Sequence, residues 1–258
     1  MNNTFNMKRF GWYFKKHTLE HLRTYLLSLT VVVGIVFLGL AIPAFSNRNG
    51  VGQGTQYAVY LFVIWLGGSI FTSTIFADLG DRKKAILQLA LPVSNLEKFL
   101  TAWLFTFPIF LIVATCAFYA VDAVILSLNH PTQGSNKLLN LFDNETPVKQ
   151  VFIVFLVFHM FSFWGAIYFN KLHFIKTGFT FFLGTLMLSL FNYIFLSIIS
   201  SGALNNQAVF FQPNILVENK LYALNLNENL FTVNWIVFAI CIILLWLSAF
   251  YKLKEKQV

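Results

Sequence analysis

Six long apolar stretches without charged residues run through this chain, separated by segments that carry all of its charge. Each stretch can hold one helix of roughly 20 residues, the length needed to cross about 30 Å of hydrocarbon. The pattern predicts membrane-spanning helices at 26–45, 57–77, 99–121, 151–169, 177–199 and 233–251. The predicted fold class is therefore an all-α polytopic membrane protein, with residues 1–258 forming a single transmembrane domain.

Basic residues fall mainly into every second segment between the spans. Of the 18 Lys and Arg residues, 14 lie on the side that holds both termini, and four, Arg48, Lys137, Lys149 and Lys220, lie on the other. Loops that stay in the cytoplasm retain Lys and Arg, whereas translocated loops avoid them. Both termini are thus predicted to be cytoplasmic, together with the segment 78–98, and the segment 200–232 is predicted to be an outer loop.

Composition supports a bilayer environment, because hydrophobic residues make up 57% of the chain and charged residues only 11%. The formal net charge of +8 is explained by contact of the basic segments with anionic lipids. Aromatic and basic residues are not interleaved as on a nucleic-acid-binding surface, so no nucleic acid is expected. The expected location is the plasma (inner) membrane, as a multi-pass protein.

Residues 1–24 form the cytoplasmic segment before the first span. A helix from about residue 5 to residue 23 would place an aromatic face on one side and most of the basic residues elsewhere. That face comprises Phe10, Tyr13, Phe14, His17 and His21, whereas Trp12 and Leu19 interrupt the pattern. Two interpretations stay open: an interfacial helix on the cytoplasmic leaflet, or a basic flank that only sets topology.

The cytoplasmic segment 78–98 combines charge, apolar residues and a helix-start signal. Asp78 and Asp81 come first, where acidic residues favour a helix N-terminus, and Pro92 then ends that helix. Ser94 and Glu97 have the spacing of a capping box, in which each side chain binds the backbone N–H of the other residue. The sequence predicts a short cytoplasmic helix, followed by a new helix that starts at Ser94 and leads into the third span.

The same segment resembles the loop of ABC-2 type transporter permeases. The resemblance rests on charged Asp81-Arg82-Lys83-Lys84, the leucine-rich run 86–91, and Pro92-Val93-Ser94 followed by Glu97, together with six spans and cytoplasmic termini. Two features depart from the family: Ala85-Ile86 replaces a Gly-Thr that often precedes the leucines, and Thr101-Ala102 replaces a later Gly-Lys. This chain would be a divergent member.

The resemblance implies that the loop is a coupling helix that docks on a separate ATP-hydrolysing subunit. The residues implied to contact that ATPase are Asp81, Arg82, Lys83, Lys84, Leu87 and Leu91. It also implies a homodimer, or a heterodimer with a similar permease, that forms a path for a substrate. The apolar interior of the spans suggests a hydrophobic or amphipathic substrate. From the residues alone, an elbow on the membrane surface explains the segment equally well.

The predicted outer loop 200–232 is long for a connection between two helices and contains the apolar run Ala208-Val209-Phe210-Phe211. One interpretation is a re-entrant segment, as the resemblance implies. The other is an ordinary loop that rests an apolar edge on lipid.

No catalytic motif is present in the sequence. It lacks a phosphate-binding Gly-x-x-x-x-Gly-Lys-Ser/Thr loop, a His-Glu-x-x-His pair and a serine–histidine arrangement. We expect no catalytic residue, metal or cofactor, and we expect that a partner subunit performs any ATP hydrolysis.

Polar residues within the spans are few. His159 lies near the middle of the fourth span, and Asn192 lies at a comparable depth in the fifth, so the two are predicted to form an interhelical hydrogen bond. A pathway-lining or protonatable role for His159 stays open. Asp122 is expected to lie at a solvated helix end, and the pairs Gly34/Gly39 and Gly67/Gly68 are expected to allow close helix packing.

A membrane protein that transports nothing is the alternative function. Such a scaffold or sensor partner would use the basic loop to recruit a cytoplasmic protein and would need no conformational cycle.

Overall fold

The computed structural model describes residues 5–46, 50–77, 86, 91–129, 137–141, 148–200, 204–205, 214–217, 220–223 and 228–256. Its six apolar helical segments are each long enough to cross a membrane, which confirms the predicted class of a six-helix membrane protein. The described residues divide into two units: Met1–Phe174 with Trp246–Val258, and Ile175–Leu245. The two are described separately.

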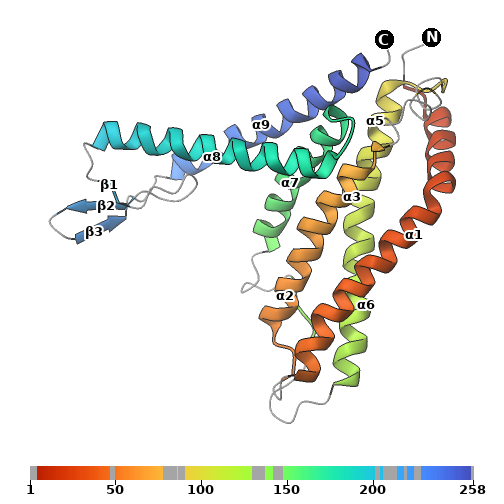
Figure 1. Cartoon of the computed structure of the whole chain (residues 1–258), viewed down its shortest axis with the longest axis horizontal. Helices are drawn as coiled ribbons and strands as arrows, with labels where there is room; N and C mark the ends of the chain where they lie inside the picture. Colours follow the sequence, from red (N-terminus) through yellow and green to blue (C-terminus); the bar gives the residue numbers. More distant parts are fainter. Residues whose placement is uncertain are drawn as a thin grey trace. The chain divides into compact units, whose positions relative to one another are not determined.

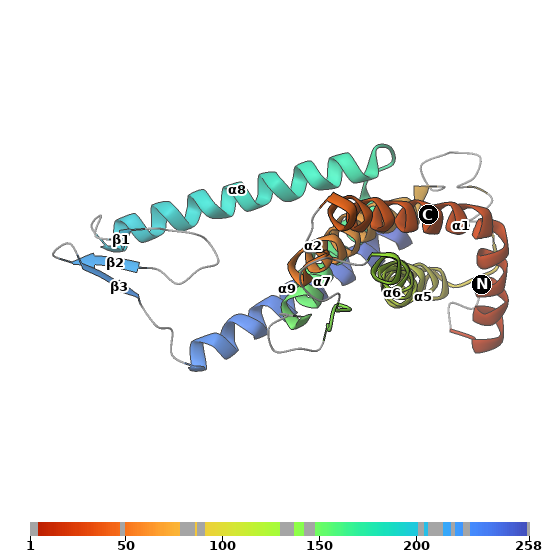
Figure 2. The same cartoon turned by 90° about the horizontal axis from the view of Figure 1, so that it is seen from below.

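The first helix, α1 (Met7–Ser46), is one continuous helix of 40 residues. At 1.5 Å per residue it is about 60 Å long, roughly twice the thickness of the hydrocarbon core. The N-terminal segment is therefore helical and joined to the first span without a break, and α1 bends along its length (Figure 2).

The second span consists of α2 (Gln53–Phe62), a π-helical turn η1 (Val63–Gly67) and α3 (Gly68–Thr74). The third consists of α5 (Asn95–Leu104), a π-helical turn η3 (Phe105–Ile109) and α6 (Phe110–Leu128). Pro108 explains η3, because proline lacks an N–H and its ring would clash with the carbonyl four residues earlier in a regular α-helix. Widening the helix by one residue relieves that clash.

The remaining helices are α7 (Val148–Tyr168), α8 (His173–Ser200) and α9 (Glu228–Glu255). Within the first unit, α1 packs along α6 and α3 packs along α7 (Figure 1). One core lies between these helices and includes Val36, Leu40, Ile64, Phe118 and Phe155, all at most 3% exposed.

A second core lies around the buried ring of Phe99 at the start of the third span. Its ring makes edge-to-face contacts with Phe163, Trp246 and Phe250 at centroid distances of 5.1, 4.9 and 5.5 Å. Such contacts favour a fixed arrangement of the rings. The last turns of α9 are thereby packed beside the beginning of α5.

The second unit contains most of α8, the first part of α9 and three short strands. The strands β1 (Leu204–Asn205), β2 (Asn214–Val217) and β3 (Lys220–Ala223) form an antiparallel sheet in the order β1-β2-β3. This sheet lies in the predicted outer loop and adds a small β element to the helical fold. The apolar run 208–211, and with it the re-entrant interpretation, lies outside the described residues.

Candidate functional site

The site begins where the predicted coupling loop returns to the bundle. Of the loop residues implied to contact an ATPase, Leu91 is described, whereas Asp81, Arg82, Lys83, Lys84 and Leu87 lie outside the described residues. The described chain resumes at Leu91 and Pro92 in a bend, and α5 starts three residues beyond Pro92.

Ser94 is the N-cap of α5 and has extended backbone angles. Its hydroxyl accepts a hydrogen bond from the Glu97 N–H at 3.3 Å, and the Ser94 N–H donates to Glu97 Oε2 at 3.1 Å. Both halves of the capping box are thus present. These two bonds start α5 at Ser94, as the sequence predicts.

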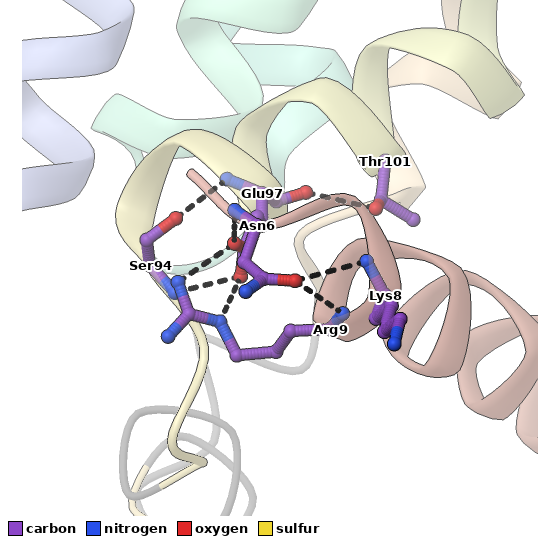
Figure 3. A network of polar contacts seen from close by, with 6 residues as sticks. All are labelled: Asn6, Lys8, Arg9, Ser94, Glu97 and Thr101. Atoms are coloured by element: carbon purple, nitrogen blue, oxygen red, sulfur yellow. Dashed lines mark hydrogen bonds and ion pairs between the residues drawn. The ribbon is translucent and has the colours of Figure 1, made fainter. Parts of the chain in front are cut away.

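The Glu97 carboxylate also binds the beginning of α1 (Figure 3). Arg9 donates from Nε to Glu97 Oε2 at 2.8 Å and from Nη2 to Oε1 at 2.7 Å, and the Asn6 N–H donates to Oε1 at 2.8 Å. The two Arg9 bonds have the forked geometry that makes arginine–carboxylate pairs specific. One side chain therefore joins residues that are about ninety positions apart in the sequence.

Asn6 explains why α1 begins at this point. Its side-chain Oδ1 accepts from the N–H groups of Lys8 at 3.0 Å and Arg9 at 3.4 Å, as an N-cap does. Its own N–H is the group that binds Glu97. Sequence analysis missed Asn6 and Arg9, although an asparagine just before an amphipathic helix is an N-cap signal.

Burial and charge make Glu97 the centre of this junction. Its side chain is 0% exposed, and its two oxygens accept from two backbone N–H groups and from the Arg9 guanidinium, whose side chain is 30% exposed. The carboxylate lies at the N-termini of both α1 and α5, where helix dipoles favour negative charge. We call Asn6, Arg9, Ser94 and Glu97 the helix-start junction.

The aromatic face of the N-terminal segment packs on the protein itself. Phe14 stacks on Phe105 at 4.8 Å, and His17, which is 7% exposed, lies 5.1 Å from the same ring. Trp12 and Leu19 are 74% and 64% exposed, so the residues that interrupt the predicted face point away from the protein. The aromatic face therefore packs in part on the third span: His17 is buried, and the other four residues of the face are half-buried.

His159 is 0% exposed, and its Nε2 lies 3.0 Å from Thr106 Oγ1 in η3. The Thr106 hydroxyl donates to the Ala102 carbonyl at 2.8 Å, so its oxygen accepts from His159, which places the ring proton on Nε2. Within the first unit the polar partner of His159 is thus Thr106. The predicted hydrogen bond to Asn192 would join the two units and stays a prediction. The π-helical turn was not visible in the spacing, and it aligns Thr106 with the histidine.

Asp122 corrects another expectation, because its side chain is fully buried rather than solvated. It lies near the end of α6 that is opposite the helix-start junction. There the segment 137–141 covers the helices with buried Leu139 and Leu141, and Tyr119 donates from its hydroxyl to the Leu139 carbonyl at 3.0 Å. A short leucine-containing segment between two helices thereby becomes part of the core.

Of the four glycines expected to allow close helix packing, Gly39 and Gly68 have a neighbour in close contact. A Cβ at Gly68 would lie 2.5 Å from Phe155 Cε2, and one at Gly39 would lie 3.0 Å from Val59 Cγ2. A Cβ at Gly34 would meet nothing within 4 Å, and one at Gly67 would meet a single atom at 3.9 Å. Close packing thus depends on Gly39 and Gly68.

Comparison of the chain with protein-family models, with curated proteins and with solved structures gave no match. The described residues contain no group of three or more His, Cys, Asp or Glu side chains that could hold a metal ion. The chemistry of the helix-start junction is that of a mechanical link: a buried, multiply bonded carboxylate holds two helix starts together.

Proposed function

We propose that this chain is the permease subunit of an ATP-binding-cassette transporter. Its six apolar helices form the membrane path, and a separate ATPase subunit supplies the energy. The observation that carries the proposal is the helix-start junction, in which Glu97 links α1 to α5 just after the loop that resembles a coupling helix. A purely connecting loop has no need of such a link.

The junction provides a physical route from the loop to two spans. Only Leu91, Pro92 and Val93 lie between residue 90 of the loop and Ser94, and the Val93 N–H donates to the Leu91 carbonyl at 2.7 Å. A displacement of the loop by a moving ATPase would shift the start of α5. The Arg9–Glu97 and Asn6–Glu97 bonds would then move α1 with it, because a multiply bonded buried carboxylate does not yield to small shifts.

The proposed assembly contains two permease chains, identical or similar, and an ATPase dimer. It resides in the plasma (inner) membrane with both termini on the cytoplasmic side, where the basic segments contact anionic lipids. The substrate class is hydrophobic or amphipathic, in keeping with the apolar spans.

The partner is tested by extracting the tagged chain from native membranes in mild detergent and identifying co-purifying proteins by mass spectrometry. We expect a P-loop ATPase in about equal amount. Its reproducible absence would refute the permease assignment and favour the scaffold.

Coupling is tested in the purified complex with two charge-removal variants. Arg82→Ala/Lys83→Ala/Lys84→Ala should abolish the stimulation of ATPase activity by the permease. The control, Lys15→Ala/Lys16→Ala/Arg23→Ala, removes the same charge from exposed positions of α1 and should preserve stimulation. Equal activity of both variants would show that the loop does not couple to the ATPase.

A further inference from the structure

Two fully buried polar side chains lie at the end of the first unit opposite the helix-start junction. Gln56 and Asp122 are both 0% exposed. Gln56 donates from Nε2 to the carbonyls of Lys137 at 2.9 Å and Val51 at 3.3 Å, which fixes the orientation of its amide. Its Oε1 and both Asp122 oxygens have no hydrogen-bond partner in the part of the chain that the structure describes.

The packing of α2 against α6 places these two residues at the same level. The Tyr60 hydroxyl lies 3.2 Å from Thr115 Oγ1, and its ring makes an edge contact with Phe118 at 5.2 Å. The helices run in opposite directions (Figure 1). One turn back from Tyr60 reaches Gln56, and one turn on from Phe118 reaches Asp122, so both steps lead toward the same end.

Among the described residues, the hydrogen bonds around this position leave three acceptor oxygens, and the donor nearest to the Asp122 carboxyl, the Leu139 N–H, completes a hydrogen bond with neither of its oxygens. A carboxylate that is ionised, buried and unpaired is strongly unfavourable, and two facing acceptors repel each other. A proton on Asp122 removes both problems, because the carboxyl then has an O–H to donate and the Gln56 Oε1 is free to accept it.

Among the described residues, the other titratable groups near this position supply no countercharge. They are the phenols of Tyr57, Tyr60 and Tyr119 and the exposed ammonium of Lys137. The Tyr119 hydroxyl is engaged with the Leu139 carbonyl. The Leu139 backbone N–H lies near the Asp122 carboxyl and favours its ionised form weakly, while burial opposes that form. No ion pair among the described residues includes Asp122.

We propose that Asp122 and Gln56 form a proton-binding site, in which the Asp122 carboxyl takes a proton from water and donates it to Gln56 Oε1. The same Gln56 amide binds the Lys137 carbonyl, so the bound proton helps to hold the segment 137–141 over this end of the helices. Loss of the proton leaves a buried charge facing an acceptor and loosens that segment. The protein is therefore more stable when the site is protonated and loses stability as the pH rises.

Infrared spectroscopy of the purified protein in lipid nanodiscs tests the proton directly. We expect a carbonyl-stretch band of a protonated carboxyl at about pH 5, which weakens as the pH rises, shifts in D₂O and is lost in Asp122→Asn. In Gln56→Leu the band should move to higher frequency, because the hydrogen bond to the amide oxygen is removed. The exposed acid Glu20 serves as the control, and Glu20→Gln should leave the band unchanged. A wild-type spectrum without a band assignable to Asp122 would overturn the proposal.

Thermal unfolding from about pH 4 to about pH 8 supplies an independent readout. The wild type should melt at progressively lower temperature as the pH rises, whereas Asp122→Asn, whose amide can donate to Gln56, should show a flatter profile. If the melting temperatures of the wild type and of Asp122→Asn changed equally with pH, proton binding at Asp122 would be refuted. Selective stabilisation of the wild type by Na⁺ over choline, with no carboxyl band, would also refute it and identify a metal cation as the occupant.

Discussion

Replacing Gly68 with alanine adds one methyl group where α3 packs against α7. The new Cβ would lie 2.5 Å from Phe155 Cε2, 3.3 Å from Phe155 Cζ and 3.0 Å from Phe110 Cε1. Ordinary van der Waals contact begins near 3.4 Å, so the Phe155 ring would have to move by about 0.9 Å.

The Phe155 ring has little room to move. It is 0% exposed, and it stacks on Phe107 with an interplanar angle of 6° and a centroid distance of 5.7 Å. Phe110 and His159 lie on its other sides at 6.2 and 5.8 Å. Overpacking of this kind costs about 1–3 kcal/mol in the free energy of unfolding.

Gly67→Ala is the matched control. Gly67 and Gly68 have nearly the same helical backbone angles, φ −60° ψ −45° and φ −63° ψ −40°, so both substitutions gain the same helix propensity of about 1 kcal/mol. A Cβ at Gly67 meets only Phe110 Cζ at 3.9 Å. The difference between the two variants therefore isolates the packing cost.

We expect Gly68→Ala to be less stable than Gly67→Ala by about 1–3 kcal/mol, measured by equilibrium unfolding in mixed micelles. Phe155→Leu should be less damaging in the Gly68→Ala background than in the wild type, because the smaller side chain gives the methyl group space. Equal stability of the two alanine variants would refute the packing of α3 on α7 described above.

Two further predictions concern single hydrogen bonds. Ser94→Ala removes the N-cap of α5 and should lower the free energy of unfolding by about 1 kcal/mol in the same assay, whereas Ser94→Thr keeps the hydroxyl and should lower it less. An alanine variant as stable as the wild type would contradict the capping role. Thr106→Val leaves the buried His159 Nε2–H without an acceptor and should cost about 1–2 kcal/mol. Most of that loss should disappear in Thr106→Val/His159→Phe, which removes both partners; an equal or larger loss in the double variant would contradict the bond.

Local sequence features predicted the parts of the site that depend on nearby residues. The capping box is visible because Ser94 and Glu97 lie within one helical turn, and their bonds form wherever that turn is helical. The second role of Glu97 was not visible, because Arg9 and Asn6 are about ninety residues away. Nothing in one sequence relates positions that far apart.

The partners of polar residues inside the spans could not be predicted from the sequence either. Depth along a helix can be counted from the sequence, and it indicated that His159 needs a polar partner without identifying Thr106. The rotation of each helix decides which side chains face each other, and the π-helical turn at Pro108 changes that rotation in the third span. Thr106 is consequently the residue that meets the histidine. For Asp122, the covering segment 137–141 decides burial, and the sequence does not show which helix end its leucines cover.

The sequence by itself determined that this is a six-helix membrane protein, because the cost of placing charged or unpaired polar groups in hydrocarbon acts on each stretch separately. It also determined the start of α5, where the capping bonds are local. Only the tertiary structure decided that Glu97 joins α1 to α5, that His159 pairs with Thr106, and that Asp122 and Gln56 lie buried at the opposite end. These outcomes depend on helix rotation and on contacts between distant segments, and packing sets both.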